Sequence, residues 1–209
     1  MGGTVALQRK FSLVPIAREI SATVSEFVYR PGKVLSGGWT FVWSKDPGPI
    51  PSGDRFKALG PLLKRETVER LSELLEELNV YVQVVPGISP TYDNNYYYGD
   101  LSIHLTVPEV RSIGQSYLTA NLVHELTHAV QEHSRGEDYE GVGPTDPVAY
   151  ALDPDEIEAH VREFVRRSKG LKVPLEKVVR DHWREFFEGD TAKARRVVRE
   201  YLRRIRRER

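Results

Sequence analysis

The stretch from Ser116 to His133 constrains the fold of this chain most, because it predicts a long helix with little polar interruption before its first histidine. Apolar residues recur through it and form the broad surface expected of a helix that crosses a core: Leu118, Leu122, Val123, Leu126 and Val130.

The stretch also contains His124-Glu125-Leu126-Thr127-His128. Positions four apart lie on one face of a helix, so both imidazoles can bind one metal ion. Glu125 follows His124 by about 100° around the axis, which suits a base acting on metal-activated water. The pattern predicts a zinc site.

Composition restricts the groups that can hold this ion. The chain of 209 residues contains no cysteine, which excludes disulfides, zinc ribbons and thiol nucleophiles and leaves His, Asp and Glu as zinc ligands. Forty per cent of the residues are hydrophobic, enough for one folded domain or for one domain with an appendage. No segment resembles a signal peptide or a membrane span. We therefore expect a cytoplasmic protein without a membrane span.

The zero net charge hides a division along the sequence. Residues 1–160 carry 13 basic and 22 acidic side chains, a net charge of −9, whereas residues 161–209 carry 17 basic and 8 acidic ones, a net charge of +9. Residues 132–158 hold nine acidic side chains and one basic one, so a cleft that they line would favour a basic peptide substrate.

The last helix combines nine basic residues, between Lys193 and Arg209, with an apolar stripe of Val197, Tyr201 and Ile205. The stripe predicts that this helix docks on its own domain or on a partner. Nucleic acid binding through residues 191–209 is an alternative that we favour less than a solvated basic face.

The order of the predicted elements indicates an α+β fold. Apolar periodicity places helices at 15–29, 61–78, 116–133, 154–168, 174–188 and 191–209, and strands at 35–44, 80–85 and 101–107. We predict a small antiparallel or mixed sheet packed on the HExxH helix and on a following glutamate helix, with a helical C-terminal extension. The expected parts are an N-terminal extension (1–58), a catalytic core (59–170) and a basic helical extension (171–209).

A catalytic zinc ion needs three protein ligands and one open position. The metzincin arrangement, with a third histidine six residues after the second and a glycine between them, is excluded because Gln131 and Ser134 occupy those positions. The helix at 154–168, with Asp153 as its N-cap, carries Glu156-Ile157-Glu158-Ala159. Together with the histidine motif, this stretch resembles the gluzincin class of zinc metallopeptidases, in which a glutamate of a second helix, often in an E-x-x-A or E-x-E-A pattern, completes the site.

The resemblance implies a hydrolase that cleaves a peptide or protein substrate, with one catalytic Zn²⁺ held by His124, His128 and Glu156. Glu125 would be the general base. Glu156 is favoured over Glu158 because it lies three residues before Ala159 on the same helix face. Glu158 and His160 remain alternatives for the third ligand. The resemblance also places the strand at 101–107 at the edge of the sheet, where a peptide substrate would pair.

Several roles stay open. Several gluzincins have an aspartate four residues after the ligand glutamate, and His160 occupies that position here, so another group must accept from the second nitrogen of a zinc histidine. A backbone carbonyl, Glu132 and Asp155 are candidates. The oxyanion donor is expected among four side chains: Tyr139, Tyr150, His160 and His182. Two other functions also stay open: a DNA-associated protease recruited by the basic C-terminal helix, and a non-catalytic module that zinc stabilises.

Overall fold

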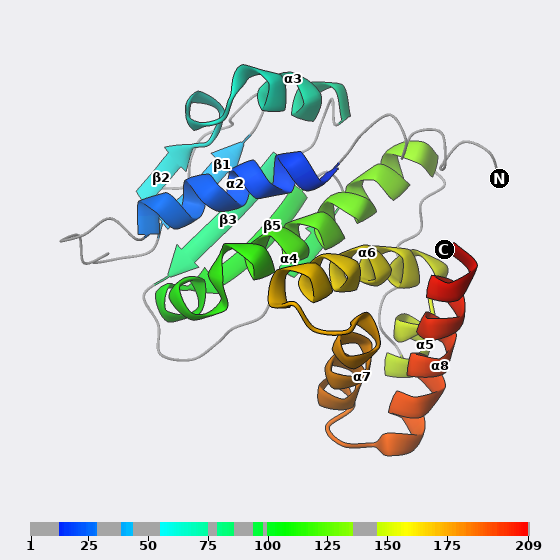
Figure 1. Cartoon of the computed structure of the whole chain (residues 1–209). Coiled ribbons are helices and arrows are strands. Elements are labelled where there is room, and N and C mark those ends of the chain that lie inside the picture. The colour runs from blue at the N-terminus through cyan, green and yellow to red at the C-terminus, as the bar shows by residue number, and fades with distance from the viewer. Residues whose placement is uncertain are drawn as a thin grey trace. The chain divides into compact units, whose positions relative to one another are not determined.

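The computed structural model describes residues 13–28, 39–43, 55–74, 79–85, 94–97, 100–135 and 146–208 (Figure 1). The chain forms two compact units that divide at Gly136. The first unit contains a sheet and the long helix of His124, whereas the described part of the second unit contains only helices.

A five-stranded mixed sheet belongs to the first unit, with the strand order β2-β1-β3-β5-β4. The strands are β1 (Trp39–Trp43), β2 (Arg55–Ala58), β3 (Asn79–Val85), β4 (Asn94–Tyr97) and β5 (Asp100–Thr106). β1 runs parallel to β2 and antiparallel to β3, while β5 runs parallel to β3 and antiparallel to β4. Phe41 and Trp43 lie two residues apart on β1 and are both buried, so this strand turns an apolar face into the core.

Two helices run side by side in the same unit, α2 (Leu13–Val28) and α4 (Val107–Arg135) (Figure 1). α4 begins directly after β5, where Pro108 fits a first helical turn because it needs no acceptor for a backbone N–H. The Ser21 hydroxyl of α2 donates to the main-chain oxygen of Gln115 in α4 at 2.9 Å. Both helices bury apolar residues: Ile16, Ile20, Val24, Leu118, Leu122 and Leu126. Each such side chain stabilises the fold by about 1.5–3 kcal/mol, so the histidine helix is firmly held.

A carboxylate of α2 caps a third helix. A short 3₁₀ helix, η1 (Gly60–Leu62), precedes α3 (Arg65–Leu74). Glu19 accepts hydrogen bonds from the Lys64 backbone N–H and from the Thr67 hydroxyl, which places a negative charge at the start of α3. Residues from the expected N-terminal extension therefore build the same unit as α4.

The second unit consists, in its described part, of α5 (Pro147–Ala151), α6 (Pro154–Leu171), α7 (Leu175–Phe186) and α8 (Thr191–Glu208). Asp146, Asp153 and Asp190 precede three of these helices and accept hydrogen bonds from backbone N–H groups of their first turns. The helices share one buried core: Val148, Ala151, Ile157, Val161, Phe164, Val178, Val179, Trp183, Phe187, Ala194, Val197, Tyr201 and Ile205. The apolar stripe of α8 thus docks on its own unit.

The predicted α+β fold class is wrong. Most residues that the structure describes lie in helices, of which the described ranges contain seven. The sheet belongs to the first unit alone, and α6, the glutamate helix, belongs to the second, whose described elements are all helical. The prediction failed because the glutamate helix at 154–168 was expected to pack on the sheet, whereas its buried residues pack with those of α5, α7 and α8.

Three local predictions are also corrected. The strand at 101–107 is not an edge, because β5 lies between β3 and β4, and β4 comes from a segment for which no strand was predicted. The helix expected from residue 61 begins only at Arg65. α6 continues past 168 to Leu171, and Lys172 follows it in the left-handed conformation, with φ of 55°. The helices expected at 15–29, 174–188 and 191–209 are confirmed as α2, α7 and α8.

Candidate metal centre

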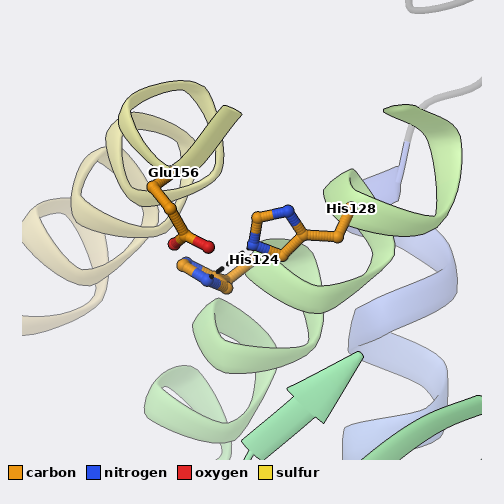
Figure 2. Close-up of side chains that lie close together, drawn as sticks. All are labelled: His124, His128 and Glu156. Carbon is orange, nitrogen blue, oxygen red and sulfur yellow. Dashed lines mark hydrogen bonds between the residues drawn. The ribbon is translucent and has the colours of Figure 1, made fainter. Parts of the chain in front are cut away.

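Two imidazoles meet on one face of α4. His124 and His128 are one helical turn apart, and their Nε2 atoms lie 3.1 Å from each other (Figure 2). The ring planes are inclined by 73° with centroids 4.9 Å apart, so the rings meet edge to face instead of stacking. Both side chains are buried. Two nitrogens that bind one tetrahedral zinc at 2.0–2.1 Å lie roughly 3.3–3.4 Å apart, so this pair needs a shift of only about 0.3 Å to share an ion.

Gln131 determines the tautomer of His128. Its Oε1 atom accepts a hydrogen bond of 2.9 Å from Nδ1 of His128, and its side chain is 1% exposed. Because an amide oxygen can only accept, Nδ1 carries the proton and the lone pair of Nε2 is directed away, toward His124. A histidine that binds zinc commonly has such an acceptor on its second nitrogen. Sequence reasoning sought it in a backbone carbonyl, Glu132 or Asp155, and missed Gln131.

Glu125, the predicted base, is buried on the same helix. Two hydroxyls nearby are bonded into the helix itself: Thr119 and Thr127 donate to the main-chain oxygens of Gln115 and Val123, each at 2.7 Å. These threonine hydroxyls are therefore engaged with the helix backbone, and the two histidines are the side chains of this part of α4 that could hold a metal ion.

Glu156, the predicted third ligand, lies in the first turn of α6, whose start Asp153 caps by accepting from the Asp155 N–H at 2.8 Å. The Glu156 side chain is 15% exposed, and its Oε2 lies 3.8 Å from Nε2 of His160. Glu158 instead pairs with Arg162 at 3.1 Å on a more exposed side of the helix. The two glutamates thus have different surroundings, as their helical spacing predicts.

A buried polar network continues along α6 from Glu156. Nδ1 of His160 bonds to Oε2 of Glu163 at 3.0 Å, and Arg167 donates to Oε1 of the same carboxylate at 3.1 Å. His182 of α7 adjoins the network, because its Nδ1 lies 3.5 Å from the Arg167 guanidinium and its ring centroid 5.0 Å from that of His160. Glu163 therefore links a buried histidine to a partly buried arginine.

Two tyrosines lie near this network. Tyr201 is fully buried in the core, and burial raises its pKa well above the ordinary range, with further contributions from Glu156, Tyr150 and Glu163. Among the described residues its hydroxyl has no hydrogen-bond partner. Tyr150 on α5 stacks on Phe186, with ring centroids 6.3 Å apart. Tyr150 is therefore partly engaged in packing.

The structure brings the predicted residues together in two groups: His124 with His128 on α4, and Glu156 with His160 on α6. Tyr139 and the side chain of Glu132 lie outside the described residues. Sequence reasoning missed Gln131, Glu163 and Arg167. Each lies three or four positions after the residue that it contacts, so helical spacing from the histidines would have found them.

Comparisons with protein-family models, with curated proteins and with solved structures find no match for this chain. Within the described ranges, no helix is both long and apolar enough to cross a membrane. Any assignment of function therefore depends on the chemistry of the residues themselves.

Proposed function

We propose that this chain is a zinc-dependent metallopeptidase of the gluzincin type, as its motif and its glutamate helix suggest. The observation that carries the proposal is the pair of Nε2 atoms, 3.1 Å apart on one face of α4. Both imidazoles are buried, and at this separation one metal ion could bind both Nε2 atoms.

The donor set fits zinc. Neutral imidazole nitrogens and a carboxylate are ligands that zinc takes in catalytic sites, and Gln131 holds His128 in the tautomer that a metal requires. The hydrogen bond to Gln131 also restricts rotation of the imidazole ring. The residues that would hold the ion are His124, His128 and Glu156.

Glu156 is the proposed third ligand on two grounds. Its position three residues before Ala159 matches the gluzincin pattern, and its side chain is less exposed than that of Glu158, which pairs with Arg162. His160 contacts Glu156 through Nε2 while Glu163 holds its Nδ1. His160 would then act as a positioning residue for the Glu156 carboxylate instead of a ligand.

A zinc ion held by these residues would supply a Lewis acid that activates water and polarises a carbonyl. The chain itself would supply the base: Glu125 would accept a proton from the attacking water and pass it to the leaving nitrogen. A carboxylate in a buried position suits this task, because it can take up a proton and release it within one turnover.

The test measures zinc content and peptide hydrolysis separately, on the full chain. Glu125→Gln is expected to retain one zinc per chain and to lose hydrolysis of a mixed peptide library by about 10²–10⁴-fold. His124→Ala with His128→Ala should abolish stoichiometric zinc. Glu158→Gln is the matched control and should change neither property.

Each contrary result has a distinct meaning. Full activity of Glu125→Gln would remove that residue from the mechanism. Zinc that persists after loss of both histidines would remove the site. Zinc that binds to His124 and His128 without any hydrolysis, and whose removal unfolds the protein, would establish the alternative of a non-catalytic module.

A further inference from the structure

The exposed side of α8 carries six arginines on one face. At 100° per residue they occupy an arc of about 120° opposite Val197, Tyr201 and Ile205, which are buried. These six residues, the arginine face, are Arg195, Arg196, Arg199, Arg203, Arg206 and Arg207. From the first to the last they extend about 18 Å along the axis.

Most of this face lacks neutralising partners. Within the described residues, Arg203 pairs with Glu200, whereas no ion pair forms at Arg195, Arg196, Arg199, Arg206 or Arg207. α7 of the same unit differs, because Lys177 pairs with Asp181 and Arg180 with Glu176. A helix that is merely solvated usually carries such alternating pairs.

The arrangement also works against helix stability. Arg195 with Arg199, Arg199 with Arg203, and Arg203 with Arg207 are like charges at i,i+4 spacing, which repel one another. A polyanion along the helix would remove this repulsion. Guanidinium groups suit phosphate in particular, since each can donate two parallel hydrogen bonds.

The buried apolar face of α8 disfavours an anionic membrane as the polyanion that this helix binds. A helix that binds a bilayer surface inserts an apolar face into it, but here that face is packed in the core of the second unit. The exposed large hydrophobic residues of the described chain are Leu62, Leu171 and Phe186, none of them on α8. The apolar face of α8 is therefore not available for insertion into a membrane.

We propose that the arginine face of α8 is a binding surface for the sugar-phosphate backbone of a nucleic acid. The proposal concerns the phosphates alone, which every sequence presents alike. The proposal does not depend on the metal site, and the zinc-ligand variants are expected to retain it.

The test is fluorescence anisotropy of the full chain with a labelled DNA duplex of about 20 base pairs and mixed sequence, over a series of KCl concentrations. Five arginines of the face have no ion pair among the described residues. If each of them contacts one phosphate, the slope of log Kobs against log[salt] is expected to be about −4.5. The triple variant Arg195→Gln, Arg199→Gln, Arg206→Gln should reduce the slope by about 2.7 and weaken binding by about tenfold or more at low salt.

The control removes the same charge from α7 through Lys177→Gln, Arg180→Gln and Arg184→Gln, and is expected to leave affinity nearly unchanged. Far-UV circular dichroism of both variants checks that α8 still folds. Equal loss of binding in both variants would show a net-charge effect and overturn the proposal. So would tighter binding to polyglutamate or to vesicles rich in anionic phospholipid than to DNA, and so would no binding to DNA at low salt.

Discussion

Two glutamate–arginine pairs on α6 predict how strongly burial controls the energy of an ion pair. Glu163–Arg167 and Glu158–Arg162 have the same i,i+4 spacing, the same helix and the same separation of 3.1 Å. They differ in exposure: the side chains of the first pair are 16% and 8% exposed, and those of the second 30% and 21%. Glu163 also bonds to His160.

The expected magnitudes follow from these surroundings. At 3.1 Å, unit charges attract by about 1.3 kcal/mol in bulk water and by roughly 5 kcal/mol at an effective dielectric constant of 20. Lost hydration and side-chain entropy oppose this attraction, so we expect a coupling energy of about 0.3–0.5 kcal/mol for Glu158–Arg162. For Glu163–Arg167 we expect about 1.5–3 kcal/mol, since the charged hydrogen bond is more desolvated.

Double-mutant cycles measure both couplings. Glu163→Gln, Arg167→Met and the double variant form one cycle, and Glu158→Gln, Arg162→Met and their double variant form the other. Urea unfolding followed by circular dichroism and by tryptophan fluorescence gives the free energies, because Trp183 lies in the core beside this network. In about 1 M KCl the Glu158–Arg162 coupling should vanish while most of the other remains. Equal couplings in the two cycles would refute the reasoning.

Three further predictions follow from single residues. Gln131→Ala should weaken zinc binding by about 10–100-fold in a chelator competition, whereas Gln131→Glu, which keeps an acceptor, should not. Tyr201→Phe should raise the free energy of unfolding by about 1 kcal/mol in urea titrations, because it removes a buried hydroxyl without a partner among the described residues. Burial raises the Tyr201 pKa, so above about pH 10 this hydroxyl ionises only in the unfolded chain. The wild type should therefore lose stability as the pH rises above that value, and Tyr201→Phe should lose less. The Lys193 backbone N–H lowers the pKa of Asp190. The contribution of the Asp190 carboxylate to folding stability is therefore present at neutral pH and is lost as the pH falls through that lowered pKa. Asp190→Asn should flatten the acid side of a profile of melting temperature against pH.

Local spacing accounts for what the sequence could predict. α2, α7 and α8 were predicted because their apolar residues recur every three or four positions, and such a stripe is visible within a single helix. The N-cap of α6 was predicted for the same reason, since Asp153 and Pro154 are adjacent to the turn that they start. His124 and His128 meet because the spacing of a helix brings them together.

Contacts between distant segments were beyond such reasoning. β5 has no free edge because β4 folds back on it, and β1 lies next to β3 although nearly forty residues separate them. Nothing in the alternation of one strand determines its neighbours. Similarly, Glu19 caps α3 from another helix, and no local pattern indicates that partner.

α8 shows how the two kinds of information combine. Its apolar stripe and its arginines were both legible in the sequence, but the stripe could have served its own domain or a partner. Since Val197, Tyr201 and Ile205 lie in the core of the second unit, the stripe is not available for a partner, and the arginines become the outer surface of the helix. An amphipathic helix with a free apolar side would have suited a membrane equally well. The packing of one face therefore decides what the opposite face can bind.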